Sequence, residues 1–407
     1  MKYFLAPATL IFSLLLLSIN VYAQKSSRME TKAARIHKAV FTVDSHTDTP
    51  LNLTQKKFNI AVNNKLVLPH SRVDFPRMQQ GGLDAVFFAV FTSQGPRTPE
   101  GNEKAKQKAD MIFDSIISAV NRNSAVSGVA TTPEQAYKLV DEKKSAVFIG
   151  VENGYPIGTE ISNVKYFYDR GARYITLCHT KNNDICTSST DTANSKGLST
   201  FGKEVVMEMN RLGMMIDVSH VSDQSFYDVL ALSKAPVIAS HSCSRAICDN
   251  PRNLTDEMLV ALAANDGVIQ MCILSDYVKK PLPNPERDSA RAAVRKKYNN
   301  FQDLTDEQWE AASTDWYSVD EKFPQKLANV SDVVDHIDHM VKIAGIDHVG
   351  IGTDFDGGGA VEGCMDASEL GNITLELVKR GYTKKQIAKI WGGNLMRVMK
   401  SVSQQAT

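Results

Sequence analysis

Eight short apolar runs, separated mostly by helical segments, constrain the fold of this chain more than any other feature. Their β-branched and aromatic content favours strands, and near-continuous hydrophobicity is typical of strands covered on both faces. The runs cover residues 39–43, 83–91, 146–151, 174–178, 214–218, 236–240, 267–273 and 349–353. Helical patterns lie between most of them, as over 103–121, 162–170, 200–212, 222–232 and 255–264. This alternation predicts an α/β fold, a single-domain (β/α)₈ barrel of TIM type over residues 24–407.

An open, doubly wound sheet is the alternative for the same alternation. The glycine-rich turn Gly-x-Gly-x-x-Gly, which would favour that fold, does not follow the first run. Between the last two strands lies a long charged insert, 276–327, with helical stretches at 289–298 and 305–312. Its length suggests a lid or an interface element over the barrel mouth, although a solvated surface excursion fits equally well. A final helix over 383–399 is expected to pack across the barrel.

The first 23 residues have the pattern of a bacterial secretory signal peptide. Lys2 supplies a positive charge, residues 10–19 are apolar apart from serines, and Val21-Tyr22-Ala23 forms a small-residue cleavage pattern before Gln24. The apolar core is too short to span a bilayer comfortably. We therefore expect an exported protein, periplasmic or secreted after signal-peptide cleavage, with no transmembrane segment in the mature chain.

Composition narrows the classes of partner. The 407 residues carry 46 basic and 46 acidic side chains, giving a formal net charge of zero. Without a basic run, nucleic acid is not expected as a partner. Six cysteines are scattered and lack the Cys-x-x-Cys spacing of a structural zinc site, and their disulfide pairing cannot be deduced from their positions.

Polar residues with metal-binding chemistry follow the predicted strands. In this fold the carboxyl ends of the strands form the active-site face, so side chains at these ends are expected to converge. Four of the nine histidines stand there, and unrelated histidines need not share that position. The residues concerned are His46, Asp48, Glu152, His179, His220, His241 and Asp354.

This set exceeds what one tetrahedral zinc ion requires. Two ions sharing a carboxylate are the economical solution. His46 and Asp48 would hold one ion, His220 and His241 the other, and Glu152 would bridge them. Two divalent ions about 3.5–4 Å apart can hold a bridging hydroxide, and the metal lowers the pKa of that water toward about 7. The sequence therefore predicts a hydrolase with two Zn²⁺ per chain.

Several motifs, in this order, resemble those of the membrane dipeptidase (renal dipeptidase) family of zinc peptidases. The resemblance runs from Asp44 to about Arg397, nearly the whole mature chain. It is carried by Asp44-x-His46-x-Asp48, Gly150-Val151-Glu152-Asn153-Gly154, Thr176-Leu177-x-His179, Asn210-Arg211-Leu212-Gly213, Ile216-Asp217-Val218-Ser219-His220-Val221-Ser222, Ser240-His241-Ser242, Arg252-Asn253 and Gly352-x-Asp354-Phe355-Asp356-Gly357.

The resemblance implies a binuclear zinc barrel that hydrolyses dipeptides with a free C-terminal carboxylate. It assigns His179 to the substrate and transition state, Arg252 to the substrate carboxylate and Asp354 to proton transfer. It also aligns Tyr277 with a tyrosine near the substrate. Asp356 is the rival for proton transfer and is ranked second, because Phe355 and the following glycines suggest that it has turned into the loop. Family members are often dimers, so a homodimer is possible.

Two other functions stay open at this stage. One is another binuclear amidohydrolase-type hydrolase, such as a lactonase or deaminase, which would not need Arg252 to bind a free carboxylate. The other is a non-catalytic exported metal- or solute-binding protein, which would have no use for Asp354 as a proton carrier. The loop 180–196 and the insert differ from the mammalian pattern, which leaves side-chain preference (L-L or L-D dipeptides) open.

Overall fold

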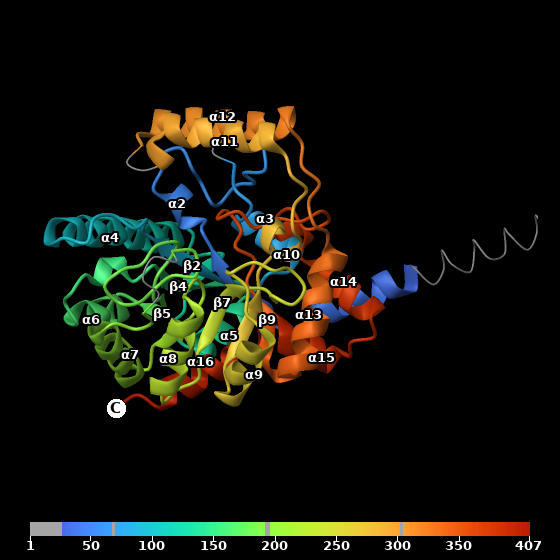
Figure 1. The fold of residues 1–407 in the computed structure, drawn as a ribbon. Coiled ribbons are helices and arrows are strands. Elements are labelled where there is room, and N and C mark those ends of the chain that lie inside the picture. Colours follow the sequence, from blue (N-terminus) through green and yellow to red (C-terminus); the bar gives the residue numbers. More distant parts are fainter. Residues whose placement is uncertain (1–26, 67–69, 192–195, 302–303) are drawn as a thin grey trace, which may run out of the picture.

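The computed structural model describes residues 27–66, 70–191, 196–301 and 304–407. Eight parallel strands follow one another around a barrel, with helices on the outside (Figure 1). They are β1 (Val43–Thr47), β2 (Ala85–Phe91), β4 (Ser145–Glu152), β5 (Ala172–Thr176), β6 (Met215–Asp217), β7 (Ile238–Ser242), β8 (Val268–Met271) and β9 (Val349–Ile351). The predicted (β/α)₈ barrel of TIM type is confirmed.

Contacts between the segment after β9 and β1 close the barrel. Thr47 bridges Phe355 in parallel register, and the Asp354 N–H donates to the His46 carbonyl at 3.0 Å. Below this bridge, Asp44 accepts hydrogen bonds from the backbone N–H and the hydroxyl of Thr353, at 2.8 and 2.5 Å. This closure rules out the open, doubly wound sheet.

The helices predicted from residues 162, 200, 222 and 255 begin within one residue of those positions, whereas the helix predicted from 103 begins earlier, at Pro99. Thr132, Ser199, Ser222 and Thr255 each cap a helix by accepting a hydrogen bond from the backbone N–H three residues on. The helices up to β9, apart from the insert, are α2 (Pro50–Leu53), α3 (Phe75–Gly81), α4 (Pro99–Arg122), α5 (Pro133–Asp141), α6 (Ser162–Asp169), α7 (Thr200–Leu212), α8 (Asp223–Leu232), α9 (Asp256–Ala264), α10 (Ser275–Val278) and α13 (Val330–Ala344). A further helix, 27–38, precedes β1, and α14 (Gly371–Lys379) follows β9.

Two details of the sheet differ from the sequence-based expectation. The first strand lies later than residues 39–43, because polar residues join its ladder once their side chains find partners across the barrel. Ser45, for example, donates to the Ser240 carbonyl at 2.6 Å. His46 therefore lies within β1 and not after it. A ninth strand, β3 (Ser127–Val129), pairs with the start of β4 and is too short to leave a periodic pattern.

The C-terminal segment packs across the barrel, as predicted, at the end opposite the strand carboxyl ends, but it is not the single helix over 383–399 that the sequence suggested. It consists of α15 (Lys384–Ala388), a π-helical turn (Lys389–Gly393) and α16 (Asn394–Gln404). Apolar side chains of α16, including Leu395 and Met399, share a buried cluster with inward-facing strand residues such as Phe87 and Phe148. This burial removes apolar surface from water and stabilises the closed end of the barrel. The end at which the strand carboxyl termini lie is not covered by this segment.

The insert forms a helical hairpin, α11 (Pro285–Lys297) and α12 (Asp306–Lys322), at the top of Figure 1. It has its own small apolar cluster around Val294, Ala312 and Val319. The hairpin lies on the side of the barrel where the strands end, and it contacts the segment after β1. Lys57 pairs with Glu310 at 2.7 Å, and the rings of His70 and Tyr317 are 4.8 Å apart. Its role as a lid or interface element stays a prediction.

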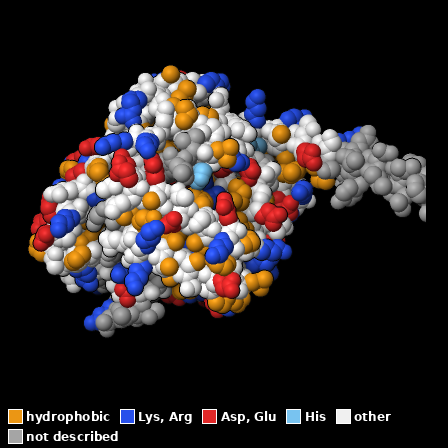
Figure 2. Space-filling model, turned by 90° about the horizontal axis from the view of Figure 1, so that it is seen from above, with side chains coloured by type: hydrophobic (Ala, Val, Ile, Leu, Met, Phe, Trp, Pro, Cys, Tyr) orange, Lys and Arg blue, Asp and Glu red, His pale blue; other side chains and the backbone are white. Residues whose placement is uncertain are grey.

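The predicted signal peptide, residues 1–23, lies outside the described residues. Within the described ranges, no helix has both the length and the apolar character needed to cross a bilayer. Basic and acidic side chains are interspersed over the face seen in Figure 2, in line with the balanced composition.

Candidate metal centre

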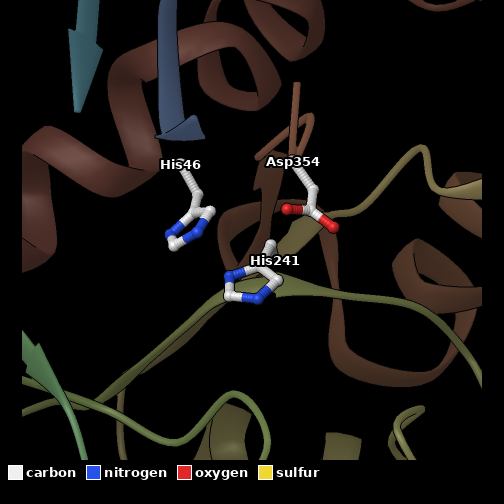
Figure 3. Close-up of side chains that lie close together, drawn as sticks. All are labelled: His46, His241 and Asp354. Carbon is white, nitrogen blue, oxygen red and sulfur yellow. The ribbon is translucent and has the colours of Figure 1, made fainter. Parts of the chain in front are cut away.

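The predicted site residues meet at the carboxyl ends of the strands. His46 and His241 lie within β1 and β7, and Glu152 is the last residue of β4. Asp48, His220 and Asp354 occupy the segments that follow β1, β6 and β9. The side chains of His46, His241 and Asp354 point toward one another (Figure 3). The barrel thus brings residues at its first and last strands into one buried cluster.

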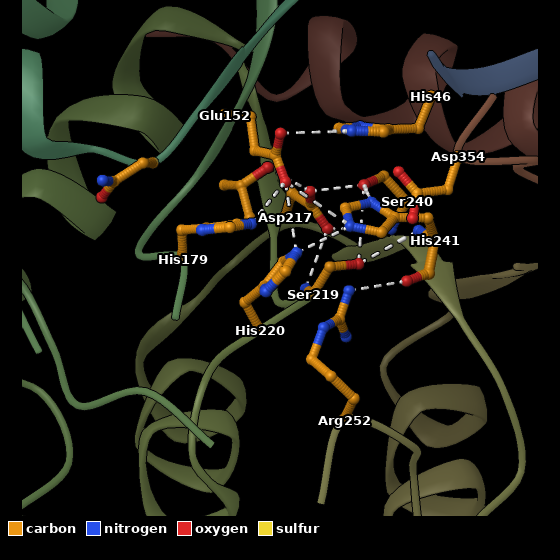
Figure 4. Close-up of polar contacts among 12 residues, drawn as sticks. His46, Glu152, His179, Asp217, Ser219, His220, Ser240, His241, Arg252 and Asp354 are labelled. Atoms are coloured by element: carbon orange, nitrogen blue, oxygen red, sulfur yellow. Dashed lines mark hydrogen bonds and ion pairs between the residues drawn. The ribbon is translucent and has the colours of Figure 1, made fainter. Parts of the chain in front are cut away.

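Glu152 occupies the middle of this cluster, with its two carboxylate oxygens facing different imidazoles (Figure 4). Oε2 lies 3.4 Å from His46 Nε2. Oε1 lies 3.2 Å from His220 Nε2 and 3.6 Å from His241 Nε2. Three overlapping groups have their potential ligand atoms within 4.8 Å of one another: His46, Asp48 and Glu152; Glu152, His220 and His241; and His46, His241 and Asp354.

Several polar atoms of this cluster lack hydrogen-bond partners within the protein and are placed to bind a cation. His46 Nε2, Asp48 Oδ1 and Glu152 Oε2 are buried and have no hydrogen-bond partner. Native proteins rarely leave buried polar atoms unpaired, because the lost hydration costs about 1–3 kcal/mol for each group. Imidazole nitrogens and carboxylate oxygens are ligands of zinc-like ions. The donor set therefore fits divalent metal.

Charges of both signs meet in the cluster: burial would raise the pKa of Glu152, but the neighbouring His46 and His179 hold it well below its usual value. Burial raises the pKa of Asp48 well above its usual value, and the neighbouring Glu152 carboxylate raises it further. Burial also raises the pKa of Asp354, with added repulsion from Cys272 and Asp48. Burial lowers the pKa of His46, but Glu152 and Asp48 outweigh it and raise that pKa to about 10. Bound cations would balance these carboxylates.

Arg252 lies beside the cluster, in the loop between β7 and α9. Its guanidinium donates to the Ser242 hydroxyl at 3.1 Å and to the His241 carbonyl at 2.9 Å. Its Nε is buried without a partner. Tyr277, on α10, has its ring 5.5 Å from the Arg252 guanidinium carbon, and burial raises its pKa to about 12. Two of the five N–H donors of Arg252 thus hold the guanidinium in place, and the buried Nε–H is among those still to be satisfied.

His179 lies at the edge of the cluster, where its side chain is 23 % exposed. Its Nε2 is 3.7 Å from Glu152 Oε1, and its ring packs against Phe91 and His220 at centroid distances of 4.8 and 4.2 Å. Burial lowers its pKa more than Glu152 raises it, which favours the neutral imidazole. A neutral ring at the edge can donate one hydrogen bond to a bound molecule.

Asp356, the rival of Asp354, is engaged elsewhere. Its carboxylate accepts hydrogen bonds from the hydroxyls of Thr49 and Ser71, each at 2.7 Å, and from the Arg72 N–H at 2.6 Å. These bonds tie three loops of the barrel mouth together. This arrangement agrees with the lower rank given to Asp356.

Three residues that support the cluster were not assigned a role from the sequence. Tyr174, Asp217 and Ser240 lie on neighbouring strands and are buried. The sequence does contain one sign of such a role: Asp217 is a charged residue within a strand that is predicted to be buried. Histidines outside the strand ends have other partners; His336, for example, contacts the Val278 carbonyl and the Ser244 N–H.

The closed (β/α)₈ barrel and the set of ligand atoms at its mouth place this protein in the class of metal-binding barrel proteins. The sequence model of the membrane dipeptidase family (Peptidase family M19) matches residues 30–407. Dipeptidase 3 of Macaca fascicularis is 30% identical over 387 residues, which cover 93% of this chain and 69% of that protein. The chain therefore belongs to the membrane dipeptidase family, whose members are metal-dependent hydrolases.

Solved structures agree with this assignment. The probable dipeptidase PvdM from Pseudomonas aeruginosa superposes with a TM-score of 0.78 at 29% identity, covering 93% of this chain and 100% of that one. A metallopeptidase from Rhodobacter sphaeroides, liganded with a phosphinate mimic of the dipeptide L-Ala-D-Ala, has a TM-score of 0.71 at 20% identity. That match covers 89% of this chain and 99% of the other, and it shows the shared fold.

Proposed function

We propose that this protein is a binuclear zinc dipeptidase that hydrolyses dipeptides with a free C-terminal carboxylate. The observation that carries the proposal is the placement of Glu152, because its two oxygens face His46 on one side and His220 with His241 on the other. His46, Asp48 and Glu152 would hold one Zn²⁺, and Glu152, His220 and His241 the second. Two bound divalent ions supply a nucleophilic water at neutral pH and polarise the scissile carbonyl.

Asp354 is suited to proton transfer. Its carboxyl is buried beside His46 and His241, where burial raises its pKa above the usual value, and a carboxyl at this position can take and release a proton. Asp354 would accept a proton from the attacking water and give it to the departing amine. A positioned acid–base group of this kind contributes about 10²–10⁴-fold in rate.

His179 and Arg252 are suited to the two ends of the reacting peptide. His179 would donate a hydrogen bond to the oxygen that becomes negatively charged when the carbonyl is attacked. Arg252 would bind the substrate carboxylate, since a guanidinium grips that group through charge-assisted hydrogen bonds. Tyr277, next to Arg252, would line the same part of the site.

Metal analysis combined with a dipeptide panel tests this function. We expect two zinc ions per chain, hydrolysis of L-L or L-D dipeptides, loss of activity with a chelator and recovery with Zn²⁺. The mimic bound by the Rhodobacter sphaeroides protein is the reason to include L-D substrates. Matched dipeptide amides, which lack the free carboxylate, are the control and should be poor substrates. One ion per chain, or equal cleavage of the amides, would contradict the proposal.

We also propose that residues 1–23 are removed on export, so that the protein acts in the periplasm or outside the cell. Mass spectrometry of the purified native protein should find Gln24 at the N-terminus. A homodimer is proposed by analogy with the family, and sedimentation of the mature chain tests it.

A further inference from the structure

Asp217 forms a buried hub beneath the candidate metal centre. Its Oδ1 accepts the backbone N–H groups of Ser219 and Ser240, at 3.0 and 2.8 Å. Its Oδ2 accepts the hydroxyls of Thr176 and Ser240. Four donors thus converge on two oxygens of a fully buried side chain. An ionised carboxylate, which only accepts hydrogen bonds, satisfies all four donors.

The direction of these bonds fixes the proton on His241. Ser240 has one hydroxyl proton, and it points at Asp217 over 2.5 Å. The Ser240 oxygen lies 2.9 Å from His241 Nδ1 and can therefore only accept there. His241 Nδ1 must carry the ring proton. The free lone pair then falls on Nε2, which is the nitrogen that faces Glu152 and His220.

A parallel arrangement supports His46. The Tyr174 hydroxyl donates to the Ser45 carbonyl at 3.2 Å and lies 2.9 Å from His46 Nδ1. When the single Tyr174 proton goes to the carbonyl, the hydroxyl can only accept from His46 Nδ1, and Nε2 is then the nitrogen directed at Glu152. His220 differs from both, because its Nδ1 is buried without a partner.

The geometry points to two hydroxyl relays, Asp217–Ser240 and Tyr174, that hold His241 and His46 in the tautomer with a free Nε2 for metal binding. Asp217, Ser240 and Tyr174 are positioning residues, since they act through the imidazoles. Partners of this kind orient metal ligands, and their loss typically costs 10–100-fold in metal affinity. This inference rests on the proposed two-metal function for its purpose, although not for its geometry.

The Asp217–Ser240 relay predicts that the isosteric substitution Asp217→Asn moves the ring proton of His241. In Asp217→Asn, the two backbone N–H groups keep the amide oxygen in the Oδ1 position, which places the NH₂ group beside Ser240. The amide would then donate to Ser240, and the Ser240 proton would turn to His241 Nδ1. The ring proton would move to Nε2 and block the ligand atom, as happens when an aspartate that orients a catalytic histidine is replaced by asparagine.

The first test compares zinc affinities by competition with a chromophoric chelator. We expect Asp217→Asn to weaken binding of at least one zinc ion by 10–100-fold, and Ser240→Ala to weaken it less. The double variant should be no weaker than Ser240→Ala alone, because without the serine the asparagine cannot reach His241. Tyr174→Phe should weaken zinc binding as well. Independent, multiplicative losses in the double variant would overturn the relay.

Two matched controls remove buried hydroxyls that lie outside the relays. Thr176→Val deletes a donor to Asp217 but leaves Ser240 in place. Ser45→Ala deletes a hydroxyl that donates only to the carbonyls of Ser240 and Ile351. Both should change zinc affinity less than threefold. An equal loss in these controls would mean that the relay residues act only through general packing.

The second test reads the tautomer directly and needs no activity. Ring nitrogen NMR of the zinc-free protein, labelled with ¹⁵N-histidine, should show His241 protonated at Nδ1, and protonated at Nε2 in Asp217→Asn. The opposite tautomer in the unmodified chain would refute the inference. A chain with the expected tautomers that binds zinc but fails to cleave dipeptides would instead refute the proposed function and leave the relays standing.

Discussion

Gly357 offers a test of the site that leaves the rest of the barrel almost untouched. It follows Asp356 in the loop after β9 and is itself exposed. A Cβ atom built on it would lie 2.1 Å from Asp48 Oδ2 and 2.3 Å from Asp354 Oδ1. The backbone of this loop therefore passes directly over two carboxylates of the cluster, at a distance that only glycine permits.

The expected effect of Gly357→Ala follows from these distances. Non-bonded heavy atoms settle at about 3.5–4.0 Å, so each carboxylate oxygen must retreat by more than about 1 Å. Short aspartate side chains can make that movement at little cost in stability. A misplacement of about 1 Å near the chemistry can cost about 10²-fold in rate. We expect kcat/KM to fall about 100-fold, and zinc affinity to fall because Asp48 has moved.

The assay measures zinc content, dipeptide hydrolysis and thermal unfolding of Gly357→Ala beside Gly371→Ala. Gly371 begins α14, and an added Cβ would meet only His37, at 4.0 Å. The control should keep full activity and gain slightly in stability, since alanine favours a helix. Full activity in Gly357→Ala would show that the two carboxylates do not need their observed positions. An equal loss of activity in Gly371→Ala would mean that the effect of Gly357→Ala is not specific to the two carboxylates.

Three further substitutions separate the roles proposed for the cluster. Asp354→Asn should keep two zinc ions and lose about 10²–10⁴-fold in kcat, measured by metal analysis and steady-state kinetics; loss of an ion would make Asp354 a ligand instead. Arg252→Lys should keep both ions but lower kcat/KM for dipeptides about 10- to 100-fold, because the charge remains while the bidentate fork is lost. Glu152→Gln should lose tight binding of at least one ion, since an amide nitrogen replaces one bridging oxygen; unchanged titration of two ions would contradict the shared carboxylate.

The barrel and the set of converging residues could be predicted because both follow from short-range patterns. Apolar runs mark strands, and the (β/α)₈ rule places every strand end on one face. The backbone at His220 and Asp354 could not be predicted. Both residues have positive φ, 69° and 60°, which non-glycine residues adopt only where surrounding contacts impose it. Those contacts, such as the Asp354 N–H on the His46 carbonyl, come from the tertiary fold.

The relay residues were missed for a related reason. A tyrosine such as Tyr174 is common in any buried strand, so its residue type gives no sign of a special role. Its contact with His46 depends on the register between strands. In the structure it pairs with Gly150 of β4, where an added Cβ would lie 2.1 Å from the Tyr174 ring. A glycine on one strand thus provides the room for an aromatic ring on the next. Such complementarity becomes visible only when the register is known.

Two other carboxylates of the chain show why the central ones indicate metal. The buried Asp217 accepts four hydrogen bonds and the half-buried Asp356 accepts three, so each is satisfied by the protein alone. Asp48 and Glu152 are buried, yet each has an oxygen with no partner. Had the cluster served only to hold the barrel together, these oxygens would also be expected to have N–H or hydroxyl donors. Their arrangement instead leaves the remaining interaction to a cation, and carboxylates brought this close repel one another until a cation is present.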